Sequence, residues 1–249
     1  MRVALSVTCM NDALFPETGR NTAKLLRRLG VDVEFPAGQA CCAQPMVNTG
    51  YLAEAVPVLR NFVRTFEEYD AVVTPSGSCA GSVRHQHAIV ARRSGDAALA
   101  HRSAELAPRV YELSEFLVDV LGVTDVGATF PGTVTYHPTC HALRMLGTAD
   151  RPVQLLREVR GLRLVELLEA TECCGFGGTF AMKNAATSVA IGEDKVRNVL
   201  ATGAQVLVAG DRSCLTHIGG LLSRARAGVR VMHLADVLAR TEADLEAAS

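Results

Sequence analysis

Short runs of β-branched and apolar residues alternate with longer amphipathic segments along this chain. The short runs occupy residues 2–7, 71–75, 133–137 and 205–210. Apolar residues recur every three or four positions over residues 52–66, which predicts a helix with a kink at Pro57. A second helix is predicted from about Asn184 to Leu200, ahead of Gly203, a residue type common after helix C-termini. Strands that alternate with helices of this length predict an α/β fold of βαβ units around mostly parallel sheets.

The same order of cysteine motifs occurs twice. In each half an isolated cysteine precedes a vicinal pair, and a cysteine after Ser follows it, with equivalent cysteines separated by 131, 132 and 135 residues. We call these sets the first quartet (Cys9, Cys41, Cys42, Cys79) and the second quartet (Cys140, Cys173, Cys174, Cys214). The segments RVYELSEFLVDV and RVMHLADVLAR echo each other at a shorter separation, because the first half carries an additional segment near RRSGDAALAH. The repeat predicts two βαβ-type lobes related by internal duplication, residues 1–125 and 126–249.

Each cysteine lies where a predicted strand gives way to a loop or helix. Ligands bind at the carboxyl edge of such sheets, and the cysteines of one quartet would converge there. Neighbouring Cα atoms are about 3.8 Å apart and their side chains splay, so a vicinal pair reaches one small metal ion only with strain. A polynuclear cluster offers a different iron to each sulfur. Four thiolates are also the usual ligand set of an iron–sulfur cluster, so the quartets favour this kind of site.

Three other interpretations of the cysteines stay open. A free cysteine is often a buried core residue, so any single one could be structural. Zinc also takes four thiolates, although the close Cys-x₂₋₄-Cys knuckles of structural zinc sites are absent. A vicinal pair could also work as a dithiol redox couple without metal.

Glycines and histidines lie beside the second quartet. In CCGFGGTFA, glycines let the backbone approach a bulky inorganic group and turn its N–H groups toward the sulfurs; they are Gly175, Gly177 and Gly178. His217 follows Cys214 by three residues on the same predicted helix face, where a hydrogen bond to a cluster sulfur is favoured over ligation. For His137 and His141, which bracket Cys140, local hydrogen bonds are expected.

The composition narrows the class of protein. The chain has 249 residues, 49% of them apolar, enough for a substantial core. A formal net charge of −1 offers no basic surface for nucleic acid. No apolar run approaches the roughly 18 residues of a membrane helix, and the first residues are apolar too briefly for a secretory leader. We therefore expect a cytoplasmic protein without a membrane span, in which cysteines serve as ligands or redox groups rather than disulfides.

Two pairs of motifs carry a resemblance to a known family. CCAQP with PSGSC in the first half, and CCGFGGTFAMKN with GDRSCLTHIGG in the second, resemble the cysteine-rich (CCG-domain) family of lactate utilization protein A, the LldE subunit of L-lactate dehydrogenase complexes. More distantly, the chain is similar to the iron–sulfur subunit of glycolate oxidase and to the cysteine-rich subunit of heterodisulfide reductase. The resemblance extends over essentially the whole chain.

The resemblance implies a function and a set of ligands. It implies an iron–sulfur redox or electron-transfer subunit that works with two further subunits in oxidising L-lactate to pyruvate. Both quartets would supply the metal ligands for one or two clusters, expected to be of the [4Fe–4S] type. The chain departs from the family pattern at Ala43, which replaces a glycine, and at Ser82 and His217, which replace cysteines that close each half.

Two functions from other classes stay open beside this one. The chain could be the catalytic subunit of a thiol–disulfide reductase of the heterodisulfide type, or a zinc-stabilised interaction module without redox function. No glycine spacing matches a dinucleotide-binding fingerprint, so neither a flavin nor a nicotinamide site is expected.

Overall fold

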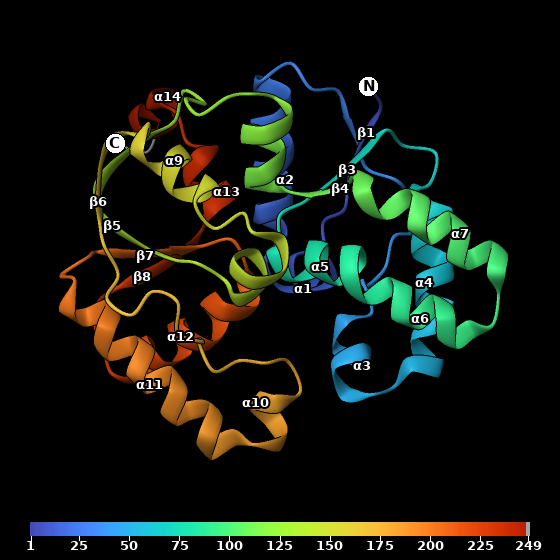
Figure 1. The fold of residues 1–249 in the computed structure, drawn as a ribbon. Coiled ribbons are helices and arrows are strands. Elements are labelled where there is room, and N and C mark those ends of the chain that lie inside the picture. The colour runs from blue at the N-terminus through green and yellow to red at the C-terminus, as the bar shows by residue number, and fades with distance from the viewer. Residues whose placement is uncertain (248–249) are drawn as a thin grey trace.

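The computed structural model describes residues 1–247, in which two four-stranded sheets are built alike (Figure 1). The strand order is β2-β1-β3-β4 in the first sheet and β6-β5-β7-β8 in the second, and all neighbouring strands are parallel. The strands are β1 (Val3–Leu5), β2 (Val33–Glu34), β3 (Ala71–Thr74), β4 (Val110–Glu112), β5 (Thr129–His137), β6 (Arg160–Val165), β7 (Val206–Ala209) and β8 (Arg230–His233). The predicted α/β class with duplicated parallel sheets is confirmed.

Helices connect the strands in both lobes. Those of the first lobe are α1 (Cys9–Leu14), α2 (Pro16–Arg28), α3 (Gln44–Thr49), α4 (Leu52–Phe66), α5 (Gly77–Gly81), α6 (His87–Ser94), α7 (Ala97–Leu106) and α8 (Leu113–Glu115), with the short turns η1 (Ser82–Gln86), η2 (Ala107–Arg109) and η3 (Phe116–Val120). Those of the second lobe are η4 (Ala142–Leu146), α9 (Arg151–Arg157), α10 (Phe180–Lys183), α11 (Ala185–Ala201), α12 (Arg212–Arg224), α13 (Leu234–Leu238) and α14 (Glu242–Glu246). None of these helices is long and apolar enough to cross a membrane.

The two helices predicted from periodicity are present. Helix α4 is continuous from Leu52 to Phe66 with Pro57 inside it, and its apolar stripe is buried; the kink at Pro57 stays a prediction. Helix α11 ends at Ala201, and Gly203 follows in the left-handed conformation at φ +66°, as expected of a glycine after a helix. The additional segment of the first half forms α6 and α7, between α5 and β4, whereas in the second lobe α12 leads directly to β8.

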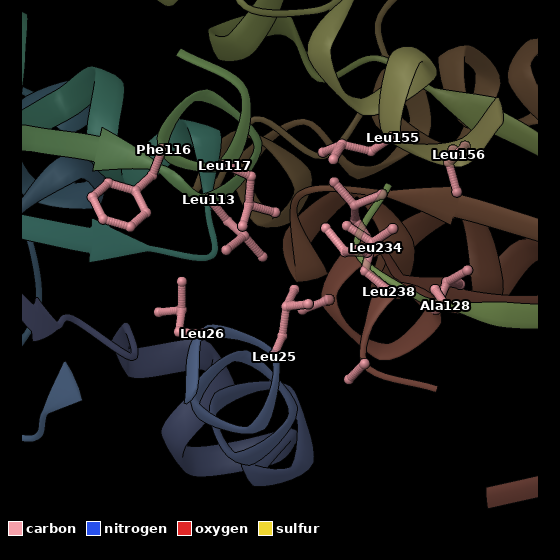
Figure 2. Packing of buried hydrophobic residues seen from close by; sticks show 14 of the residues in the cluster. Leu25, Leu26, Leu113, Phe116, Leu117, Ala128, Leu155, Leu156, Leu234 and Leu238 are labelled. Atoms are coloured by element: carbon pink, nitrogen blue, oxygen red, sulfur yellow. The ribbon is translucent and has the colours of Figure 1, made fainter. Parts of the chain in front are cut away.

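A single hydrophobic core joins the two lobes. Helix α2 and the α8–η3 segment of the first lobe face α9 and α13 of the second, and their leucines and Phe116 interdigitate between the sheets (Figure 2). Ala128, just before β5, is buried in the same core, and so is Val126. A second core covers the outer face of the first sheet, and a third covers the outer face of the second. The predicted boundary between residues 125 and 126 stays a prediction.

The contacts between the lobes come in equivalent pairs. Helix α2 packs on α13 and α8 packs on α9, while α1 contacts α12 and α5 contacts η4. The first two contacts are equivalent to each other, because α2 and α9 follow the equivalent strands β1 and β5, and α13 and α8 follow the equivalent strands β8 and β4. The other two are equivalent in the same way, because α1 and η4 follow β1 and β5, and α12 and α5 follow β7 and β3. The lobes therefore face each other with approximate twofold symmetry. The elements at this interface include α1, α5 and α12, which contain Cys9, Cys79 and Cys214, and η4, which follows Cys140.

Candidate metal centres

Three neighbouring strands bring each quartet together. In the first lobe Cys9 begins α1 after β1, Cys41 and Cys42 lie in the loop after β2, and Cys79 lies in α5 after β3. The order β2-β1-β3 makes these strand ends adjacent. The chain leads from β1 to β2 on one side and from β3 to β4 on the other, so the edge between β1 and β3 is the usual ligand-binding crevice of such a sheet. The second quartet lies at the corresponding edge of β6-β5-β7.

The thiols of each quartet lie side by side as free thiols. Cys9 Sγ is 3.6 Å from Cys41 Sγ, and the thiol of Cys42 interacts with both Cys41 and Cys79. In the second lobe the same chain of contacts leads from Cys140 through the vicinal pair to Cys214. No disulfide joins any of the eight, all of which lie in the described part of the chain. The predicted convergence of the cysteines within each half is confirmed.

The same cysteine of each quartet favours the thiolate form. Hydrogen bonds from the neighbouring thiols, Cys42 first, hold the pKa of Cys41 far below its usual value. The pKa of Cys173 is lowered in the same way, with Cys140 as the main donor. Neighbouring thiols and burial instead raise the pKa of the remaining vicinal cysteines, Cys42 and Cys174. The thiolate is the metal-binding form of cysteine, and both lobes favour this form at the first cysteine of the vicinal pair.

The residue after each vicinal pair has a left-handed backbone. Gly175 has φ +89°, and Ala43, at the equivalent position, has φ +67°. The first lobe therefore keeps the backbone turn although it lacks the glycine of the family pattern. In the second lobe this turn directs the Gly175 N–H at Cys173 Sγ, at 3.3 Å, as expected for a loop that stabilises a thiolate. A third unusual conformation precedes Cys9, where the β-branched Thr8 has φ +75°, a strained arrangement of the kind that concentrates at functional sites.

A buried lysine holds the loop that carries the second vicinal pair. Lys195 in α11 is fully buried, and its ammonium donates to the carbonyl oxygen of Glu169 at 2.6 Å. Burial lowers the pKa of Lys195, whereas Glu172 and the nearby thiols of the second quartet raise it. The cation thus fixes the loop and adds positive charge close to these thiols.

Polar side chains of the two lobes contact each other near the cysteines. Gln44, two residues after Cys42, contacts Nε2 of His141 in the other lobe at 3.0 Å. Asp211 is buried and bonds to the start of α5, accepting from Ser76 Oγ at 2.5 Å and from Ser78 Oγ at 2.8 Å. The local hydrogen bond expected for His141 is therefore wrong, because its partner lies 97 residues away.

The structure places His217 behind the glycine loop rather than on a thiol. Its Nε2 is 3.2 Å from the Ser188 carbonyl oxygen and 3.4 Å from the Ser188 hydroxyl. A Cβ added to Gly175 would lie 3.2 Å from the same nitrogen, so the ring packs closely against this turn. The role of His217 beside a bound cluster stays a prediction, as does that of Gly177 and Gly178.

The histidine that faces the second quartet is His137. It ends β5 with a fully buried side chain, and a ring nitrogen lies with Cys174 Sγ and Cys214 Sγ in a group whose atoms are all within 4.8 Å of one another. The pKa of Cys214 is lowered to about 6, mainly by the Cys174 thiol and further by His137. The local hydrogen bond expected for His137 is wrong, because neither ring nitrogen has a partner of acceptable geometry. In the sequence, the position of His137 before Pro138 does not indicate that the ring faces these sulfurs.

A hollow between the lobes opens onto the first quartet. It measures about 280 Å³ and is lined by all four of these cysteines. The second lobe closes it with Phe176, Thr179 and Met182, from the segment after its own vicinal pair, and with Arg212. The four converging thiols, one of them with a lowered pKa, and the space beside them fit a soft metal or an iron–sulfur cluster. The second quartet offers the same thiols with His137 in addition.

Comparison with known proteins identifies relatives over nearly the full length. The cysteine-rich domain family (CCG) matches residues 3–84 and 134–219. Lactate utilization protein A of Oceanobacillus iheyensis is 44% identical over 238 residues, which covers 96% of either chain. Lactate utilization protein A of Bacillus subtilis is also 44% identical over 238 residues, covering 96% of this chain and 99% of its own.

A solved structure supports the fold. The crystal structure of a hypothetical protein from Helicobacter pylori superimposes with a TM-score of 0.59 at 10% sequence identity. The match covers 95% of this chain and 48% of the other, so the chain spans about half the length of that protein. At this identity the likeness extends to the fold alone.

Proposed function

Since the chain belongs to the lactate utilization protein A family and carries two cysteine-rich domains of the CCG type, we propose that it is the iron–sulfur electron-transfer subunit of a complex oxidising L-lactate to pyruvate. A role in lactate utilization follows from the family. The iron–sulfur cofactor, two further subunits as partners and a location in the cytoplasm are parts of the proposal.

The observation that carries the proposal is the repetition of one thiol arrangement. Each quartet gathers at the carboxyl edge of a parallel sheet, and in each the first cysteine of the vicinal pair has a lowered pKa. Cysteines that only fill the core would not need the same arrangement in both lobes. Thiols gathered at one sheet edge, with one of them favouring the thiolate, are suited to bind a metal.

The residues of the chain would hold and shield the cofactor. The first quartet would bind one centre beside the hollow, and the second quartet would bind the other, with Lys195 and the Gly175 N–H stabilising its negative charge. A bound iron–sulfur cluster would supply one-electron transfer. Burial of Cys42, Cys174 and Cys214 keeps water away from part of each ligand set.

Lactate oxidation itself is assigned to a partner. Removing two electrons from a 2-hydroxy acid needs a base for the hydroxyl proton and a hydride acceptor, which is usually a flavin or a nicotinamide. The chain offers eight thiols for electron transfer and no dinucleotide-binding fingerprint. We therefore expect the isolated chain to leave lactate unoxidised, and to become necessary once the partner subunits are present.

Reconstitution tests this function. The anaerobically purified chain is combined with the two partner subunits, and lactate-dependent reduction of an acceptor dye is measured. Cys173→Ser is expected to abolish the activity while the complex stays assembled, and Glu172→Gln, at the exposed neighbouring position, is expected to leave it intact. Full activity of Cys173→Ser, or turnover of lactate by the chain alone, would contradict the proposal.

One observation favours thiol–disulfide reduction as a second candidate. The low-pKa thiol of Cys41 lines the hollow together with the exposed Cys9, so a disulfide substrate could reach a nucleophilic sulfur there. Reduction of a disulfide substrate by the isolated chain, lost in Cys41→Ser, would favour this candidate over electron transfer to a partner.

A further inference from the structure

The side chain of His137 is fully buried, and the Cys214 thiol, whose pKa it lowers, is the group with which it interacts. Neither Nδ1 nor Nε2 meets a donor or acceptor of acceptable geometry within residues 1–247. Buried polar groups in native proteins are nearly always paired, so an unpaired imidazole calls for an explanation. One of its nitrogens belongs with Cys174 Sγ and Cys214 Sγ to a group of atoms within 4.8 Å of one another.

The other buried or half-buried histidines of the described chain are each paired at one nitrogen at least. His87 Nε2 lies 3.0 Å from the carbonyl oxygen of Cys42, and His233 Nδ1 accepts from the N–H of Ala235 at 3.1 Å. His141 contacts Gln44, and His217 contacts Ser188. His137 thus differs from all four, and it is the one that faces two cysteine sulfurs.

The first lobe has no counterpart of this imidazole. Counting back from the first cysteine of each quartet, Ser6 precedes Cys9 by three residues as His137 precedes Cys140. Ser6 is also buried, at the end of the equivalent strand segment, but a neutral hydroxyl is a poor ligand for a soft metal. The duplicated sites therefore differ in their donor atoms: four sulfurs in the first lobe, and four sulfurs with one imidazole in the second.

We propose that His137 is a metal ligand of the second lobe, bonding through a ring nitrogen beside Cys174 and Cys214, so that the two lobes hold chemically different centres. This inference rests on the proposed metal binding by the quartets. Imidazole is a neutral donor that suits iron and zinc alike, and a ring nitrogen without a hydrogen-bond partner is free to bind a metal. A metal would also pair a nitrogen that is otherwise buried alone.

Pulsed EPR on the reduced, anaerobically purified full chain tests the ligand directly. We expect a histidine nitrogen coupling that changes when ¹⁵N-histidine is incorporated and that is absent from His137→Cys. In His137→Cys a thiolate replaces the imidazole, so iron is retained and the midpoint potential of the second-lobe centre falls. His217→Ala is the matched control, because it removes a histidine of the same lobe and is expected to keep the coupling.

The outcomes separate this inference from the proposed function. Iron in the wild-type chain without histidine coupling, or coupling that persists in His137→Cys, would overturn the assignment of His137 and leave electron transfer standing. A chain without iron would overturn the proposed function. In that case cobalt(II) titration of the metal-free chain decides. Cobalt binding that His137→Ala weakens at least about tenfold, and that His217→Ala leaves unchanged, supports His137 as a ligand. Equal cobalt affinity in wild type and His137→Ala overturns the assignment.

Discussion

Single residues set the shape of the two cysteine loops. At Gly175 a Cβ would lie 2.4 Å from the carbonyl oxygen of Ser188 and 3.1 Å from the backbone nitrogen of Gly192. The left-handed φ is a further reason for glycine there. At Ala43 the same backbone conformation accommodates a methyl group, which is fully buried. The second loop thus depends on its glycine for space as well as for conformation.

Substitution of Gly175 is expected to damage the second lobe. Gly175→Ala should lower the free energy of unfolding by about 3 kcal/mol or more, from the left-handed backbone and the close contact with Ser188. Gly220→Ala is the control: Gly220 is exposed in α12 with open space around it, so alanine should stabilise that helix by up to about 1 kcal/mol. Equal urea midpoints for the two variants would contradict this account.

A buried carboxyl is expected to make stability depend on pH. Burial raises the pKa of Glu112 from 4.5 to about 7, although hydrogen bonds from Ser114 and Glu115 act in the opposite direction. Because the folded pKa is the higher one, the contribution to stability is complete below pH 4.5 and is lost as the pH rises to 7. The loss amounts to about 3 kcal/mol.

Glu112→Gln tests this dependence, because the amide cannot titrate. The unfolding free energy of wild type minus that of Glu112→Gln should fall between pH 4.5 and 7.5 in urea titrations. The exposed Glu54 serves for comparison, and Glu54→Gln should show no such trend. A difference that rises with pH would refute the raised pKa.

At this scale the sequence located the cysteines but misjudged the hydrogen bonds of His137 and His141. The quartets are visible because their order is repeated and strands precede most of their members. A histidine gives no comparable signal: His137 and His217 both lie three residues from a cysteine, yet only His137 faces sulfur. The direction of a side chain at a strand end depends on the local turn, and sequence spacing does not fix it.

At the scale of elements, α11 supports the loop between β6 and the second vicinal pair. Glu169 in this loop has φ +48°, and its carbonyl oxygen accepts from the buried Lys195 ammonium. The left-handed backbone of Glu169 and its hydrogen bond from Lys195 occur at the same residue. This indicates that α11 holds the loop in a conformation that the loop would not keep alone.

Loss of the lysine is expected to loosen the second site only. Lys195→Met removes the charged donor to the Glu169 carbonyl oxygen, at a cost of about 1–3 kcal/mol for the loss of a hydrogen bond to a charged group. Amide hydrogen exchange over residues 166–174 should accelerate, and iron should be lost from the second lobe but retained in the first. The exposed Lys183 provides the matched variant, Lys183→Met, which should behave like wild type. Unchanged exchange and iron content in Lys195→Met would show that the tether is dispensable.

The elements that periodicity revealed are those with a buried face. Helix α4 buries five side chains on one stripe, and α11 likewise buries one face, so both were predictable. Helices α3 and α10, which follow the two vicinal pairs, bury no residue and leave no periodic signal. Their conformation depends on contacts with the rest of the molecule, which a single sequence does not reveal.

At the scale of the whole molecule, the two lobes share both a core and a polar contact at the site. The apolar faces of α2, α8, α9 and α13 pack against one another in the shared core. Sequence analysis did not identify these faces as an interface, since an apolar stripe carries no record of which helix covers it. The duplication was predictable because the order of the cysteine motifs is repeated in the sequence. The interface between the lobes leaves no such repeat and is known only from the structure.

Asp211 is expected to stabilise this interface. It is buried and accepts hydrogen bonds from Ser76 and Ser78 of the other lobe, at the start of the helix that carries Cys79. Asp211→Ala should lower the unfolding free energy by about 3 kcal/mol, because these donors are left unpaired. Asp194→Ala, in an exposed ion pair of α11, should change it by less than about 0.5 kcal/mol. Equal effects of the two variants would contradict an interlobe role.

Iron and sulfide analysis of the anaerobically purified chain tests the central claim most directly. If each quartet binds its own iron–sulfur centre, wild type contains iron and acid-labile sulfide in nearly equal amounts, and Cys41→Ser and Cys173→Ser each retain about half of the iron. A colourless protein with stoichiometric zinc, or complete loss of iron in both variants, would contradict two independent iron–sulfur centres.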